Sequence, residues 1–67
     1  MKLIRLSEVI DRTGLARATI YKYMAEGDFP ASVSLGGRSV GWVDEEIDVW
    51  IKSKVAARDR AQRPSYQ

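Results

Sequence analysis

The sequence has 67 residues, with 11 Lys and Arg against 9 Asp and Glu, and it contains neither His nor Cys. This length predicts one small domain, near the lower limit at which a single hydrophobic core folds without other support. The missing Cys excludes disulfides and thiolate metal sites, and the missing His removes the usual general base and imidazole ligand. A hydrophobic fraction of 45% indicates a packed core. No apolar run approaches the roughly 20 residues of a membrane span. We therefore expect a cytoplasmic binding module without cofactor, metal or small-molecule substrate, and not an enzyme.

Charge is unevenly distributed along the chain. Residues 44–50 contain four acids and no base, whereas residues 51–67 contain five bases and one acid. Within this region Asp48 and Lys52 have the spacing of an i, i+4 ion pair. Acids that open a helix and bases that close it also complement the helix dipole, so both a structural and a functional explanation stay open.

Two short helices are predicted near the N-terminus. The first covers residues 5–14, with Ser7 as its candidate N-cap and Gly14 as the residue whose left-handed conformation ends it. The second covers residues 17–26. Because only about three residues including Gly14 connect them, the two helices must turn sharply, which is the helix-turn-helix arrangement.

A β-hairpin is predicted after the second helix. Polar and apolar residues alternate over 32–35 and again around 40–43, and Gly36 and Gly37 lie between the two runs. Adjacent glycines between alternating runs indicate a tight turn, because both tolerate positive φ. Gly41 interrupts the second run and indicates a β-bulge there.

A third helix is predicted to begin after Asp44, its candidate N-cap, and to end near Arg58. Its apolar face is formed by Ile47, Trp50, Ile51 and Val55. Residues 60–67 show no periodicity, so we expect a single domain over residues 1–59 followed by a flexible tail over residues 60–67.

Helix, tight turn, helix, hairpin and helix is the order of a compact winged helix-turn-helix. The predicted fold class is therefore mainly α, with three helices and a two-stranded wing. In such a module the second helix enters the major groove of double-stranded DNA, which is roughly 12 Å wide. The hairpin can then reach a neighbouring groove or phosphate.

The exposed face of the second helix supplies the candidate DNA contacts. Arg17 and Ala18 lie at its N-terminal end, from which recognition helices contact base edges, and Tyr21 and Lys22 lie nearer the phosphates. Thr19 lies at the edge of this face, where its hydroxyl could donate to a phosphate oxygen or cap the turn. The alternative for Arg17 and Lys22 is an ordinary solvated helix face. For Tyr21 the alternative is packing against the core.

The predicted hairpin and the two tryptophans raise further candidates. Arg38 lies at the hairpin tip, and a narrow minor groove attracts an inserted arginine. The alternative is a solvent-exposed turn residue. Trp42 and Trp50 could stack on bases, but both occur at core positions of their elements, which favours packing.

Motifs in a particular order cover residues 3–58. They are Leu6-Ser7-Glu8-Val9, Thr13-Gly14-Leu15, Thr19-Ile20-Tyr21, Met24-Ala25-Glu26-Gly27, Phe29-Pro30, Leu35-Gly36-Gly37-Arg38, Val40-Gly41-Trp42 and Glu46-Ile47-Asp48-Val49-Trp50-Ile51. With these motifs the chain resembles the AlpA family of prophage-associated DNA-binding regulators, which are akin to phage excisionases and to the DNA-binding domain of MerR-type proteins. It departs from the family at Ala16, where a Ser or similar cap is usual. Alanine cannot cap, at a cost of about 1 kcal/mol.

The resemblance implies a transcriptional regulator of a prophage or integrative element that controls integrase expression or excision. One alternative is an excision factor that bends attachment-site DNA, and a less favoured one is an anti-repressor that grips a protein. A single module of this size would bury only roughly 600–1,000 Å² on DNA. We therefore expect self-association on repeated sites.

Overall fold

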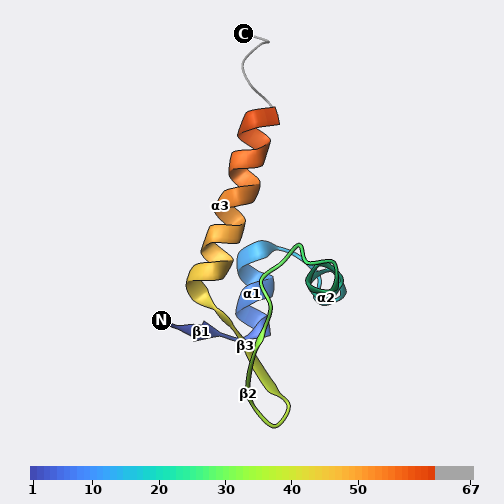
Figure 1. Ribbon diagram of the computed structural model, residues 1–67, viewed down its shortest axis with the longest axis vertical. Helices are drawn as coiled ribbons and strands as arrows, with labels where there is room; N and C mark the ends of the chain where they lie inside the picture. The colour runs from blue at the N-terminus through green and yellow to red at the C-terminus, as the bar shows by residue number, and fades with distance from the viewer. Residues whose placement is uncertain (62–67) are drawn as a thin grey trace.

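The three helices and the hairpin of the sequence prediction are present in the computed structural model, which describes residues 1–61 (Figure 1). In chain order the elements are β1 (Leu3–Ile4), α1 (Leu6–Thr13), α2 (Arg17–Ala25), β2 (Val33–Gly36), β3 (Ser39–Val43) and α3 (Asp44–Ala61). The mainly helical winged helix-turn-helix class is therefore confirmed.

The sheet has a third strand that the sequence pattern does not indicate. Strand β1 pairs antiparallel with β3, with Leu3 opposite Val43 and Ile4 opposite Trp42, so the strand order is β1-β3-β2. The backbone N–H of Asp44 also donates to the carbonyl oxygen of Lys2 at 2.8 Å. The N-terminal segment thus forms backbone hydrogen bonds with both the central strand β3 and the first residue of α3.

The hairpin turn follows the prediction. Gly36 has φ of 105° and Gly37 has φ of 56°, both in the range that side chains disfavour. The pairing of β2 with β3 becomes irregular between Ser34 and Gly36, so the bulge lies on β2 around Leu35. Arg38 is exposed in the turn between β2 and β3. This turn lies at the end of the molecule opposite α3 (Figure 1).

The predicted bulge at Gly41 is wrong, and the glycine serves another purpose. A Cβ placed on Gly41 would lie 3.2 Å from the carbonyl oxygen of Ile4 and 3.2 Å from the Cδ1 atom of Leu35. Gly41 is therefore favoured by the close approach of the strands on either side of it rather than by an extra residue.

The core draws one side chain from nearly every segment. Its buried members are Ile4, Val9, Ile20, Phe29, Trp42 and Ile47. Trp42 is fully buried, and the edge of the half-buried Trp50 ring packs against Phe29, with the ring centroids 4.8 Å apart. The indole N–H of Trp50 donates to the carbonyl oxygen of Asp28 at 2.6 Å. Both tryptophans therefore pack as predicted. Strand β2 lies outside the core, and all of its residues are exposed.

Helix α1 ends where the sequence predicts, but its N-cap is a different residue from the predicted one. The helix begins at Leu6 with Arg5 at its cap position and no side-chain capping bond, so the assignment of Ser7 as the N-cap is wrong. The chain passes from β1 into the helix so quickly that Ser7 already lies in the first turn. At the other end Gly14 has φ of 72°, and its N–H donates to the carbonyl oxygen of Ile10 at 2.8 Å. The predicted stop is confirmed.

Helix α3 begins at Asp44 itself, directly after β3, and continues through Ala61, past the predicted end near Arg58. Its apolar face leaves the core earlier than predicted: Ile47 is buried, but Val55 is 43% exposed. Every residue from 52 to 61 is exposed, and the helix projects away from the sheet (Figure 1). The molecule measures 53 × 24 × 19 Å as a result. Most of the predicted tail lies outside the described residues.

Candidate nucleic-acid interface

The turn between α1 and α2 is held by hydrogen bonds and one deep anchor. The Thr13 hydroxyl donates to the carbonyl oxygen of Val9 at 2.8 Å and accepts from the N–H of Leu15 at 3.2 Å. No side chain caps α2 at Ala16, as the sequence predicts. Ile20 is fully buried one turn into α2. Because a helix rotates as a rigid unit, burial of Ile20 decides which side of α2 faces solvent.

The exposed face of α2 is the one predicted from helical spacing. Its exposed residues are Arg17, Ala18, Tyr21, Lys22 and Ala25. Thr19 is half-buried at the edge of this face, also as expected. These residues form one continuous strip along α2, so any partner that lies along this helix meets all of them together.

Tyr21 combines the two alternatives that its sequence position left open. Its ring meets Trp42 edge-on, with centroids 6.4 Å apart and ring planes at 65°. The side chain nevertheless leaves Tyr21 39% exposed. On the exposed side, the guanidinium carbon of Arg17 lies 5.9 Å from the centre of the Tyr21 ring. Successive contacts thus lead from the core to the surface, from Trp42 through Tyr21 to Arg17. The last contact favours positions of the Arg17 guanidinium beside the Tyr21 ring.

The candidate cations are not neutralised by neighbouring acids. Within residues 1–61, ion pairs join Arg12 to Asp44, Lys52 to Asp48 and Arg58 to Asp59, and none involves Arg17, Lys22 or Arg38. The positive charge of α2 and of the hairpin tip is therefore available to an anionic partner. Arg17 and Tyr21 lie together on α2. The turn between β2 and β3, which holds Arg38, lies apart from α2 (Figure 1).

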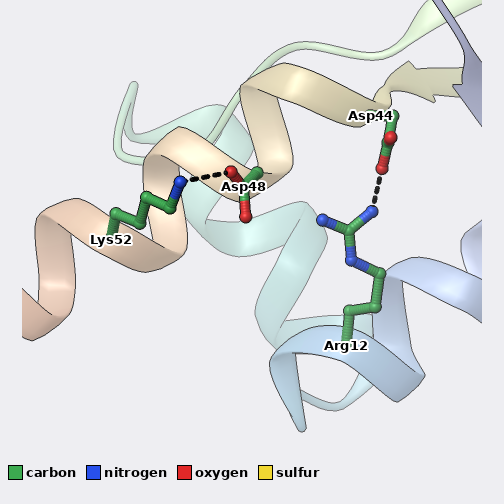
Figure 2. A network of polar contacts seen from close by, with 4 residues as sticks. All are labelled: Arg12, Asp44, Asp48 and Lys52. Atoms are coloured by element: carbon green, nitrogen blue, oxygen red, sulfur yellow. Dashed lines mark hydrogen bonds and ion pairs between the residues drawn. The ribbon is translucent and has the colours of Figure 1, made fainter.

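One ion pair joins α1 to the start of α3. The Arg12 guanidinium, on α1, contacts the Asp44 carboxylate at the start of α3, and both side chains are about two-thirds or more buried, with exposures of 24% and 35% (Figure 2). A second pair, Asp48 with Lys52 at 2.9 Å, lies on the more exposed side of α3. The sequence shows the i, i+4 spacing of the second pair. It carries no signal for the first, whose members are 32 residues apart.

The described part of the chain shows neither a metal cluster nor a membrane span. Within residues 1–61, no three His, Cys, Asp or Glu side chains are grouped so as to hold a metal ion. No helix in that range is long and apolar enough to cross a membrane. The exposed strip of α2 presents cations, one phenol and small side chains.

Comparison with known proteins gives matches over nearly the whole described chain. The family described as prophage CP4-57 regulatory protein (AlpA) matches residues 2–55, which extend from β1 well into α3. "Uncharacterized protein ORF88" of Enterobacteria phage P4 is 41% identical over 59 residues, which cover 88% of this chain and 67% of that protein. "DNA-binding transcriptional activator AlpA" of Escherichia coli (strain K12) is 40% identical over 60 residues, which cover 81% of this chain and 86% of that protein.

Proposed function

Since the chain belongs to the family of the prophage CP4-57 regulatory protein (AlpA), we propose that it is a sequence-specific DNA-binding regulator of transcription encoded by a prophage or integrative element. The observation that carries the proposal is the exposed strip of α2, in a helix-turn-helix anchored by Ile20, where Arg17 and Lys22 have no acidic partner among residues 1–61. A relative at 40% identity is named a DNA-binding transcriptional activator, which supports the same function.

In this proposal α2 lies in the major groove and its N-terminal end reads bases. Arg17 donates two hydrogen bonds to guanine N7 and O6, which discriminates against other bases by roughly 1–3 kcal/mol. Ala18 offers a methyl group to a thymine methyl. Thr19, Tyr21 and Lys22 contact phosphate oxygens and fix the register of the helix on the duplex.

The hairpin makes the second contact. Its exposed β2 strand and its turn extend away from the core, so Arg38 reaches either a phosphate or the neighbouring minor groove. Because the guanidinium of Arg38 is at the tip of a two-stranded ribbon, this contact adds affinity more than sequence discrimination.

The regulated process is integrase expression or excision of the element. Selection of bound fragments from the source genome, followed by footprinting, tests the proposal and separates these processes. Sites over an integrase promoter support a transcriptional activator, and sites inside an attachment region support an excision factor. Repeated sites filled together support self-association on DNA.

An anti-repressor that grips a protein is the competing function. It predicts that no genomic fragment is enriched above background and that the α2 strip is instead protected by a protein partner. Absence of enrichment at salt concentrations well below physiological would contradict the DNA-binding proposal, because phosphate contacts strengthen steeply as salt falls.

A further inference from the structure

We propose that two copies of this chain pair through α3, antiparallel, about a two-fold axis that passes beside Ser53. The starting observation is that α3 is poorly covered by its own chain. Of its eighteen residues only Ile47 is buried, and every residue from 52 to 61 is exposed. Most helical stability in proteins comes from packing one face against something else, and this half of α3 has no such contact within residues 1–61.

A groove marks the face on which the second copy would lie. It runs between α3 and the loop that joins α2 to β2, and its walls include Phe29, Pro30, Val49, Trp50 and Ser53. Val49 is 64% exposed there, beside the buried ring of Phe29 and the half-buried ring of Trp50, and this is an unusual position for an aliphatic side chain. The Ser53 hydroxyl donates to the carbonyl oxygen of Trp50 at 2.7 Å, so this hydroxyl is satisfied within its own helix.

Helical geometry continues this face along α3 in both directions from Ser53. At 100° per residue, the positions within about 60° of Ser53 are Glu46, Val49, Trp50, Ala56, Ala57 and Arg60. The middle of the face is therefore small or apolar, which allows two helix backbones to approach closely. Its acidic end is Glu46 and its basic end is Arg60.

Charge complementarity identifies the occupant as a second copy in the antiparallel direction. Glu46 and Arg60 lie seven residues before and after Ser53, so a two-fold axis at Ser53 places Glu46 of each copy opposite Arg60 of the other. The same operation places Val49 opposite Ala57 and Trp50 opposite Ala56. A parallel pairing would instead bring like charges together. The helix dipole explains the signs of the two ends, but it does not require an exposed valine between them.

The area buried between the two α3 helices is expected to be small, so the dimer should be stable only under some conditions. The segment from Glu46 to Arg60 is about 22 Å long at 1.5 Å per residue. One helix pair of that length falls at or below the low end of stable interfaces, about 1,200 Å² in total. We therefore expect a weak dimer in free solution. It becomes strong when two DNA sites hold the copies at high effective concentration. This second step rests on the proposed function, and none of the proposed DNA contacts lines the groove.

Cysteine trapping tests the pairing directly, because the chain has no cysteine of its own. Ser53→Cys places two thiols beside the proposed axis, within the roughly 4.4–6.8 Å Cα separation that a disulfide needs. Val55→Cys is the matched control, since Val55 is 43% exposed on the opposite side of α3. We expect rapid disulfide formation in Ser53→Cys under mild oxidation and only slow, random linkage in Val55→Cys. Equal rates would overturn the proposal.

Charge reversal supplies an independent test in the same full chain. Glu46→Arg and Arg60→Glu each place like charges in contact at both ends of the pair, so each should weaken self-association at least about tenfold in sedimentation equilibrium. The double variant restores both contacts with no change in net charge, and it should return to near the original association constant. Failure of the double variant to recover, with its helix content intact by circular dichroism, would contradict the antiparallel register.

The two proposals fail differently. If the dimer proposal is wrong, the single reversal Glu46→Arg leaves cooperative filling of paired DNA sites unchanged. If the DNA-binding proposal is wrong, the chain binds no duplex. The disulfide between two copies of Ser53→Cys still forms, because the trapping experiment is carried out without DNA.

Discussion

Arg17 contacts the ring of Tyr21, which in turn contacts the buried ring of Trp42. This position supports the proposed role of Arg17 in contacting a base. The contact with Tyr21, which itself meets the buried Trp42, favours rotamers that keep the guanidinium beside the Tyr21 ring. A side chain with fewer accessible rotamers loses less entropy on binding a base.

Arg17→Ala should therefore relax sequence preference at one or two base pairs of the bound site. The expected loss is roughly 1–3 kcal/mol for the preferred sequence and little for sequences that already lack the guanine. Equilibrium binding to a panel of single-base variants of the site measures this change in binding free energy. Arg5→Ala is the matched control, because it removes one positive charge from another exposed residue. An unchanged preference would place Arg17 away from the bases.

Lys22 and Arg38 belong to the electrostatic part of the interface. Lys22→Ala or Arg38→Ala should weaken binding to all sequences alike, because phosphates carry no sequence information. Each loss should also reduce the slope of log affinity against log salt by about 0.9. Lys2→Ala, another exposed cation, serves as the control, and an equal effect there would show that only net charge matters.

Tyr21 can be divided into its ring and its hydroxyl by two substitutions. Tyr21→Phe keeps the ring contacts with Trp42 and Arg17, so stability in urea should be unchanged, while affinity for DNA falls if the phenol donates to a phosphate. Tyr21→Ala removes the ring as well and should cost about 0.5–1.5 kcal/mol of stability beyond the lost buried area. Full DNA affinity in Tyr21→Phe would assign Tyr21 to packing alone.

At the scale of elements, the sequence predicts those features whose signals are local. Gly14 and the Gly36-Gly37 pair end a helix and make a turn through their own backbone freedom, and Ile20 fixes the exposed side of α2 through helical spacing. Strand β1 escapes prediction because two residues are too few to show alternation. The N-cap at Ser7 fails for the same reason, since the cap position depends on where the unrecognised strand ends.

The ion pair between α1 and α3 is the long-range contact that the sequence hides. Arg12→Ala or Asp44→Ala should lower the free energy of unfolding by about 1–2 kcal/mol, because the pair is partly buried and each change leaves the other charge unpaired. Urea unfolding measures the loss. The exposed pair Asp48 and Lys52 is the control, and Asp48→Ala should cost less than about 0.5 kcal/mol. Equal losses at the two pairs would show that the α1–α3 contact adds nothing.

The chain has two distinct surfaces. The α2 strip and the hairpin tip carry positive charge that no acid among residues 1–61 pairs, while the projecting α3 carries a self-complementary arrangement of acid, small residues and base. The net charge of +2 conceals this division, since the acids gather at the start of α3. Helical spacing predicts the exposed face of α2 in full. The groove beside α3 could not be predicted, because it depends on how the loop after α2 lies against a helix distant in sequence.

In the proposed function the α2 strip and the hairpin bind the phosphates and bases of a duplex. The most direct test is the affinity of the full chain for its selected genomic site, measured over a range of salt concentrations. Two cationic phosphate contacts alone predict a slope of log affinity against log salt of about −2, and further contacts make it steeper. Weak binding of equal strength to every duplex, with no dependence on salt, would contradict the account.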